Sequence, residues 1–229
     1  MNHDNTHRYE RKFVVSAVST VDVEFILKCH PALFSEIYQE RWVRNIYYDT
    51  PDYDFYHSNI NGDTNRVKAR IRWYGEQFGA VEAPMLEFKI KKGLLGWKKH
   101  YKLIPFILDS RFDHQKYTNE LRSSEKNDLL NQIGFTSLFP VLVNGYRRKY
   151  FLSADHKYRI TIDSEQVFYS ISTNNNFFIR ESRNSSNVIT ELKYDSSYDA
   201  SAPDLSSLFP FRLGKNSKYV EGIQSCYCD

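Results

Sequence analysis

The segment RVKARIRW, residues 66–73, alternates cationic and apolar side chains without interruption. In an extended strand every second side chain points to the same face, so the cations share one face and the apolar residues share the other. Neighbouring cations on such a face lie roughly 6.6 Å apart. At an effective dielectric constant of ~20, two of these charges repel by about 2.5 kcal/mol. The row must therefore be solvated or face a polyanion. It consists of Arg66, Lys68, Arg70 and Arg72.

Other segments repeat this alternation, and each has a charged face opposite an apolar face. The charged faces combine carboxylates with cations: Glu10 with Lys12, Glu87 with Lys89, Arg159 with Asp163, and Glu191 with Lys193. Solvated faces usually carry Thr, Ser, Gln and Lys, whereas arginine, which is prominent here, suits bidentate phosphate contacts. The composition of the charged faces therefore favours a phosphate-binding surface over a merely wet one.

The alternating segments predict a fold dominated by strands. Strands are expected at residues 9–15, 42–48, 65–74, 85–91, 98–104, 141–152, 157–163, 166–171, 177–182 and 188–194. Most follow one another closely, which favours antiparallel pairing. Closing such a sheet with its charged face inward would make a tunnel. We therefore expect an α+β fold: a closed antiparallel β-barrel tunnel of roughly eight strands with a charged interior, covered outside by a few helices.

Helices are expected in fewer places. Thr20 can cap a helix that runs to about Cys29, and a second short helical piece is expected between Pro31 and Tyr38. Residues 113–133 predict the main helix, and residues 196–210 a loop followed by a short helix. The tail from Lys215 onward is compatible with a helix or a strand. Asp49 and Asp52 are typical of a turn.

Composition limits the class of protein. The 229 residues carry a net charge of only +3, so any anion site must come from arrangement rather than bulk charge. The low charge and the interleaved acids disfavour a reader of double-stranded nucleic acid. Three cysteines do not make a disulfide framework. No apolar run reaches roughly 18 residues, and the N-terminus lacks the apolar core of a signal peptide. We expect a cytoplasmic protein with no membrane segment in this chain.

Eight segments run in order through nearly the whole chain: RYERKFVV (8–15), NIYYDTPDYDFY (45–56), RVKARIRWYG (66–75), LEFKIKKG (86–93), YRRKYF (146–151), RITID (159–163), ELKYD (191–195) and KNSKYV (215–220). Together they resemble the VTC domain, the catalytic domain of the vacuolar transporter chaperone family. That domain belongs to the CYTH, or triphosphate tunnel metalloenzyme, superfamily. The resemblance implies a single domain over residues 1–229, built as an antiparallel β-tunnel with charged walls.

The resemblance also implies an activity and a site. In the polymerase branch of the family, the γ-phosphate of ATP is transferred to a growing polyphosphate chain and ADP is released. ATP and inorganic polyphosphate are therefore the implied ligands, and Mn²⁺ or Mg²⁺ the implied cofactor. The implied catalytic residues are Arg70, Arg72, Lys89, Arg148 and Arg159. The implied substrate-binding residues are Lys12, Arg66, Lys68, Tyr146, Lys193, Lys215, Ser217 and Lys218. The implied metal-holding carboxylates are Glu191, Glu10 and Glu87. One further basic position, after the glycine loop, could be Lys98, Lys99 or Lys102.

The chain departs from the superfamily pattern at its first strand. Triphosphatases of the superfamily carry Glu-x-Glu-x-Lys there, and this chain has Arg8, Glu10 and Lys12 at those positions. Loss of the first acid weakens a two-carboxylate metal site for activating water, which favours phosphoryl transfer over hydrolysis. The sequence also shows no membrane segment and no inositol-phosphate sensor domain, so translocation of a product would need a separate membrane partner.

Three functions stay open on the sequence. The preferred one is a metal-dependent polyphosphate polymerase that uses ATP. The second is a hydrolase that cleaves tripolyphosphate or a nucleoside triphosphate. The third is a non-catalytic module that binds polyphosphate.

Overall fold

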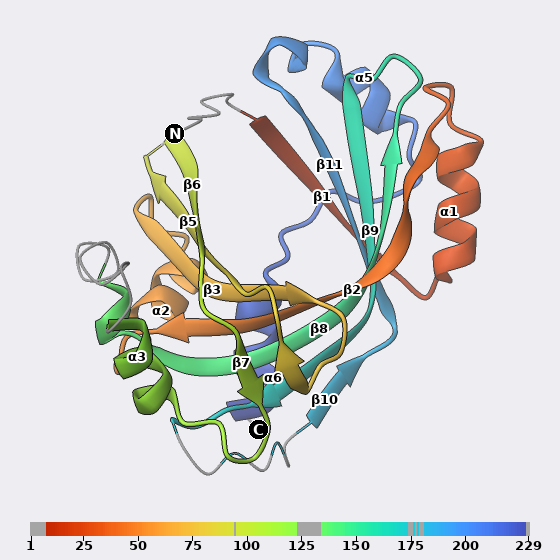
Figure 1. The fold of residues 1–229 in the computed structure, drawn as a ribbon. Helices are drawn as coiled ribbons and strands as arrows, with labels where there is room; N and C mark the ends of the chain where they lie inside the picture. The colour runs from red at the N-terminus through yellow and green to blue at the C-terminus, as the bar shows by residue number, and fades with distance from the viewer. Residues whose placement is uncertain are drawn as a thin grey trace. The chain divides into compact units, whose positions relative to one another are not determined.

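The computed structural model describes residues 8–227 except 94, 123–133, 174, 175, 177, 179 and 180. Within this range the main sheet has nine strands, in the order β1-β11-β9-β8-β2-β3-β5-β6, and β10 pairs with β9 (Figure 1). Its strands are β1 (Arg8–Ser16), β2 (Ser35–Asp49), β3 (Arg66–Tyr74), β5 (Met85–Lys92), β6 (Leu95–Lys102), β8 (Phe139–Leu152), β9 (Tyr158–Ser170), β10 (Glu181–Asn184) and β11 (Asn187–Asp195). A separate two-stranded sheet consists of β4 (Gly79–Val81) and β7 (Phe106–Leu108).

The helices are short. Those in the described residues are α1 (Thr20–Lys28), α2 (Asp54–Asn61), α3 (His114–Arg122), α5 (Ala202–Ser207) and α6 (Lys218–Tyr227), with 3-10 turns at Phe135–Ser137 and Ser196–Tyr198. No helix in the described ranges is both long and apolar enough to cross a membrane.

The expected antiparallel sheet is present, but the expected closed barrel is not. Each ladder whose register is known is antiparallel. The strand order ends at β1 on one side and at β6 on the other, and no pairing joins these two strands among the described residues. Closure was inferred from the alternation of charged and apolar residues. Alternation determines which face each side chain joins, but not whether the two edge strands meet.

The described chain forms two compact units, and β2, β8 and β9 contribute residues to both. Unit 1 combines the described parts of Met1–Trp42, Tyr146–Gln166 and Arg183–Ser217. Unit 2 combines those of Val43–Gly145, Val167–Ser182 and Lys218–Asp229. Each unit has its own apolar core, so each can be described separately. The single domain expected over residues 1–229 stays a prediction.

The core of unit 1 lies between its strands and α1. Val23 and Leu27 of α1 are fully buried against the apolar faces of β1, β9 and β11, which include Phe13, Ile160 and Leu192. A capping box starts α1, in which the Ser19 hydroxyl accepts from the backbone N–H of Asp22. The expected cap, Thr20, is instead the first helical residue. Ser19, one position earlier, has the extended backbone that a cap requires.

The helical piece expected between Pro31 and Tyr38 was also wrong, because β2 already begins at Ser35. Pro31 interrupts the helical pattern, and the following Ile37, Tyr38 and Trp42 belong to the β-branched and aromatic classes that favour strands. In the same way, the two strands expected at 157–163 and 166–171 are one continuous strand, β9.

The apolar core of unit 2 lies on one face of its strands. Ala69, Ile71 and Trp73 of β3 pack there with Leu86 and Phe88 of β5. Tyr117 of α3 joins the same core, so α3 covers the apolar face as expected. The expected helix continued to residue 133, but residues 123–133 lie outside the described ones.

A second cluster of unit 2 surrounds α6, the helix formed by the tail. Tyr219 and Ile223 of α6 pack with Tyr47, Leu142 and Phe168. Tyr47 pairs in register with Arg70, so the two side chains share a face of the sheet. Helix α6 therefore packs on the face that carries the cationic row. The sequence did not predict helix α2. The strand expected at 177–182 falls largely outside the described residues, and β10 begins at Glu181.

Candidate functional site: two charged clusters

The structure confirms the two faces expected for residues 66–73. Ala69, Ile71 and Trp73 are buried, whereas Arg70 and Arg72 lie half-buried on the opposite face. The register of β3 then determines their neighbours. Arg70 is opposite Tyr47 of β2 and Glu87 of β5, and Arg72 is opposite Asn45 and Met85. The only carboxylate in these facing pairs is Glu87.

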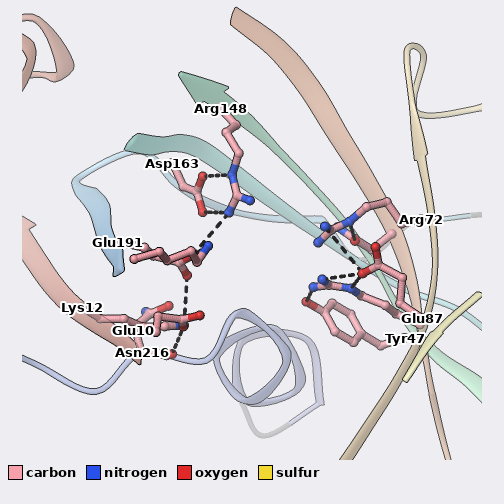
Figure 2. A network of polar contacts seen from close by, with 12 residues as sticks. Glu10, Lys12, Tyr47, Arg72, Glu87, Arg148, Asp163, Glu191 and Asn216 are labelled. Atoms are coloured by element: carbon pink, nitrogen blue, oxygen red, sulfur yellow. Dashed lines mark hydrogen bonds and ion pairs between the residues drawn. The ribbon is translucent and has the colours of Figure 1, made fainter. Parts of the chain in front are cut away.

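Glu87 is the centre of what we call the arginine cluster (Arg70, Arg72, Glu87, Tyr47 and Asn45). Its Oε2 accepts from Arg70 Nε at 2.7 Å and lies 2.6 Å from a second nitrogen of the same guanidinium. Arg72 is 3.5 Å from the same oxygen and donates through Nε to Asn45 Oδ1 at 3.0 Å. Figure 2 shows Arg72 and Tyr47 next to Glu87. One carboxylate thus holds both guanidinium groups in place.

The electrostatics of Glu87 follow from these contacts. Burial alone would raise the pKa of its carboxyl, but the charges of Arg70 and Arg72 and the hydrogen bond from Arg70 lower that pKa to about 2. His100, whose Nδ1 lies 3.5 Å from Oε1, acts in the same direction when it is protonated. The carboxylate therefore remains ionised and the arginines remain compensated throughout the physiological range.

Replacing Glu87 with Gln is expected to change stability mainly in acid. In the unfolded chain the pKa of Glu is about 4.3, above the folded value of about 2. The ionised carboxylate therefore contributes stability that is complete above about pH 4.3 and disappears as pH falls through about 2, a loss of about 3 kcal/mol. Urea unfolding of wild type and Glu87→Gln between pH 2 and pH 7 checks this. The variant should lose less stability over the acid range. A steep acid loss equal to that of wild type, or the same flattening in the exposed control Glu82→Gln, would contradict it.

A row of lysines lies next to the arginine cluster. Lys68 of β3 is directly opposite Lys89 of β5, which is directly opposite Lys98 of β6. Arg66 is likewise opposite Lys91. Like charges placed directly across a sheet are destabilising. The three lysines add positive charge to the face that carries the arginine cluster.

Register also narrows the choice among the three lysines of β6. Lys98 and Lys102 pair with Lys89 and Met85, so they lie on the face of the arginine cluster. Lys99 pairs with Phe88 and lies on the apolar side. The sequence left all three open because a glycine loop of uncertain length preceded them. The structure leaves Lys98 and Lys102.

Unit 1 carries a second cluster, in which carboxylates and cations lie together on β1, β9 and β11. Glu10 of β1 is opposite Lys193 of β11, which is opposite Arg159 of β9. One step along, Lys12 is opposite Glu191, which is opposite Thr161. Arg148 of β8 joins them through Glu191, at 3.8 Å. We call these residues, with Asp163, the mixed cluster.

Lys12 links the two carboxylates of the mixed cluster. Its Nζ lies 3.0 Å from Glu191 Oε1 and 3.3 Å from Glu10 Oε1, and it donates to the backbone carbonyl of Asn216 at 3.2 Å (Figure 2). Burial alone would lower the pKa of this amine, but the charges of Glu191 and Glu10 raise it well above its usual value. Lys193 holds the other Glu191 oxygen at 2.7 Å. Lys12 is therefore a cation under all ordinary conditions.

Arg148 forms a buried, two-pronged ion pair with Asp163. Its Nε and Nη2 donate to the two oxygens of Asp163 at 2.5 and 2.6 Å, and Asp163 is fully buried (Figure 2). Burial would lower the pKa of Arg148, but Asp163 raises it well above its usual value. Asp163 is therefore the ion-pair partner of Arg148. Nη1 of Arg148 has no hydrogen bond or ion pair within the described ranges.

The remaining predicted residues are placed as follows. Tyr146 is buried, with the Arg148 guanidinium 5.2 Å from its ring centroid. Arg159 is exposed and forms no ion pair among the described residues. Lys215 is exposed in the segment before α6. Ser217 is half-buried, and Lys218 is buried at the first position of α6.

The carboxylates expected to hold a metal are divided between the clusters. Glu10 and Glu191 belong to unit 1 and share Lys12, whereas Glu87 belongs to unit 2 and is occupied by arginines. No group of three or more His, Cys, Asp or Glu suited to a metal occurs among the described residues. Mg²⁺ and Mn²⁺ typically use one or two carboxylates and take the remaining ligands from phosphates and water. Glu10 with Glu191 fits that pattern.

Sequence reasoning missed several residues that complete the clusters. Asn45 and Tyr47 stand at alternate positions of one strand, so the alternation that identified Arg70 could have placed them on the same face. The contact of Asn216 is made by its backbone carbonyl, which no side-chain pattern reveals. Thr161 is buried, and its hydroxyl has no hydrogen bond among the described residues, although it lies opposite Glu191.

Asp49, expected to be a turn residue, instead caps the first turn of α2. Its carboxylate is fully buried and accepts the backbone N–H groups of Phe55 and Tyr56 at 2.9 Å each, in the first turn of α2. It also accepts the hydroxyl of Tyr219 from α6. Asp49 therefore connects two helices and has a structural role.

Comparison with known proteins identifies relatives by family and by fold. A family model described as "VTC domain" matches residues 7–227. No curated protein matches the chain. A candidate adenylate cyclase from Vibrio parahaemolyticus superposes with a TM-score of 0.50, at 10% identity over 94% of this chain and 98% of that one. A candidate adenylyl cyclase from Hippeastrum, described as having a dominant triphosphatase activity, gives 0.50 at 12% identity over 92% and 93%. At these identities the likeness shows the fold alone.

Proposed function

Because this chain belongs to the VTC domain family, we propose that it is a metal-dependent phosphotransferase that adds the γ-phosphate of ATP to inorganic polyphosphate. One observation carries the proposal. In the facing pairs of β2, β3, β5 and β6 that make up the charged face of unit 2, many cations accompany a single carboxylate, Glu87. The cations are Arg66, Lys68, Arg70, Arg72, Lys89, Lys91, Lys98 and Lys102. Such an excess suits a ligand with many negative charges in a row.

Phosphoryl transfer depends on positioning and on charge neutralisation more than on covalent help from the protein. In unit 2 we assign Arg70 and Arg72 to phosphate oxygens, since Glu87 holds their guanidinium groups in place before a ligand arrives. Lys68 and Lys89 continue the same row and would neutralise further phosphates.

In unit 1 we assign Lys12, Lys193, Arg148 and Arg159 to phosphates, alongside carboxylates that could hold a divalent metal. Glu10 and Glu191 are the proposed metal-holding residues. A bound Mn²⁺ or Mg²⁺ would neutralise phosphate charge and orient the phosphates. Lys12 at present compensates both carboxylates, so its amine would have to move towards phosphate as the metal takes its place.

Hydrolysis of a triphosphate is the second candidate. The triphosphatase activity described for the Hippeastrum neighbour favours it. So does the pairing of both Glu10 and Glu191 with the amine of Lys12, which keeps the two carboxylates close together. The replacement of the first acid of the Glu-x-Glu-x-Lys pattern at Arg8 weighs against it, because activation of water needs a well-held metal. We therefore rank hydrolysis below transfer.

Incubation of the purified chain with ATP, Mn²⁺ and a short polyphosphate primer tests the proposal. Transfer predicts longer polyphosphate and an equal amount of ADP. Orthophosphate or pyrophosphate without chain growth would establish a hydrolase instead. Tight binding of polyphosphate with no turnover, with either Mn²⁺ or Mg²⁺, would indicate a module that binds polyphosphate without catalysis. The matched control, Glu191→Gln, should lose turnover if the metal proposal is right.

A further inference from the structure

Unit 1 contains a ladder of alternating tyrosines and arginines whose outer members, Tyr150, Arg41 and Tyr38, have no role in the proposed phosphate chemistry. It begins at the buried Tyr146, passes through Arg148 and Tyr150 on β8, and ends at Arg41 and Tyr38 on β2. The guanidinium carbon of Arg148 lies 5.2 Å from the ring centroid of Tyr146 and 6.0 Å from that of Tyr150. The guanidinium carbon of Arg41 lies 4.8 Å from the Tyr150 centroid and 5.4 Å from the Tyr38 centroid.

The outer end of the ladder is open to solvent. The Tyr38 side chain is 53% exposed, and Arg41 is also exposed. Tyr38 meets Tyr150 edge to face, with ring centroids 5.6 Å apart and an interplanar angle of 88°. Tyr150 and Arg41 hold the Tyr38 ring, yet about half of its surface stays uncovered. An aromatic ring that is fixed in position but not covered is suited to stack a flat ligand.

The inner end of the ladder is the mixed cluster. Arg148 belongs to both, because it pairs with Asp163 and lies 3.8 Å from Glu191 (Figure 2). Lys12 and Lys193 flank Glu191 on the other side. A ligand with phosphates at the mixed cluster and a flat, electron-rich group at the other end would follow the ladder outward. Nucleoside triphosphates have that construction, whereas tripolyphosphate lacks the flat group.

We propose that Tyr38, with Arg41 and Tyr150, is a stacking platform for the nucleobase of a nucleoside triphosphate whose phosphates lie at the mixed cluster. This inference rests on the proposed function and deepens it, because it gives the chain a preference for nucleotide over inorganic triphosphate. A base would lie on the uncovered part of the Tyr38 ring, and the Arg41 guanidinium would add a cation–π contact with the same base.

Binding measurements on two ligands test the platform. Calorimetric titrations with ATP and with inorganic tripolyphosphate, both without divalent metal so that no transfer occurs, are made on wild type and on Tyr38→Ala. Wild type should bind ATP more tightly than tripolyphosphate. Tyr38→Ala should lose about tenfold in ATP affinity, the effect typical of removing one stacking partner, and should bind tripolyphosphate as wild type does. Tyr74→Ala is the matched control, because Tyr74 is 54% exposed and belongs to unit 2.

The possible results separate this inference from the proposed function. Equal wild-type affinities for the two ligands, with no change in Tyr38→Ala, would overturn the platform and leave the phosphate site standing. If Tyr38→Ala lost the same affinity for both ligands, Tyr38 would support the phosphate site itself, and the platform would also be overturned. Binding of neither ligand by wild type, also when the titrations are repeated with Mn²⁺, would overturn the proposed function together with the platform.

Discussion

Replacing Arg70 with Ala is expected to lower kcat/KM for ATP-dependent polyphosphate synthesis about a hundredfold or more, in a protein that still folds. Arg70 makes the closest contacts to Glu87, at 2.6 and 2.7 Å, so its guanidinium is pre-positioned on the charged face of β3. A fixed cation contributes most where phosphate charge builds up in the transition state. Glu87 keeps Arg72 at 3.5 Å after the change, so it is not left uncompensated and the sheet should persist.

Arg66→Ala is the matched control for this effect. Arg66 belongs to the same cationic face, but it is opposite Lys91 rather than a carboxylate. Nothing in the facing pairs holds it in one geometry, and we expect its loss to reduce activity less than tenfold. Arg70→Lys should recover only part of the activity, because an ammonium cannot reproduce the two-pronged contact of a guanidinium. Equal losses in Arg66→Ala and Arg70→Ala would show that the row acts as a general anion-attracting surface. Full activity in Arg70→Ala would end its assignment to phosphate oxygens.

The faces of this sheet were predictable because the alternation within a strand depends only on backbone geometry. In the structure Ile71 and Arg70 lie on opposite faces of the strand, as the alternation of residues 66–73 predicts. The same rule places Glu10 with Lys12 and Glu191 with Lys193. The antiparallel pairing also followed, since short connections join most successive strands. These features are local, and a single sequence contains them.

The pairing partners were not predictable, because they depend on which strands meet and in what register. Nothing in the segment around Glu87 shows that it faces Arg70 rather than one of the neighbouring lysines. The grouping of Glu87 with Glu10 and Glu191 as metal ligands came from resemblance, and the structure places them in different units. The prediction of a closed barrel was wrong within the described residues. Closure requires the two edge strands to pair with each other, and the sequence of a single strand does not reveal this.

Replacing Asp163 with Asn is expected to cause the largest loss of stability of any single change in the mixed cluster. Asp163 is fully buried and holds Arg148 through two short contacts, at 2.5 and 2.6 Å. Removing one partner of a buried ion pair leaves an uncompensated charge, which costs about 3–5 kcal/mol. Glu191, at 3.8 Å from Arg148, lowers that cost only partly, because Lys12 and Lys193 already share its charge. For a chain of this length, Tm should fall by roughly 6–20 °C.

Calorimetric melting curves check this loss against two further variants. Glu165→Gln removes a carboxylate from the same strand, but that residue is more than half exposed and its contact with Arg147 is 3.5 Å long, so we expect a change within about 1 kcal/mol. The double variant Arg148→Met with Asp163→Leu removes both buried charges and should recover much of the stability lost in Asp163→Asn. If the double variant melts as low as Asp163→Asn, the loss comes from disturbed packing and not from the unpaired charge of Arg148. If it regains stability but binds ATP poorly, Arg148 contributes to the ligand site and Asp163 serves to position it.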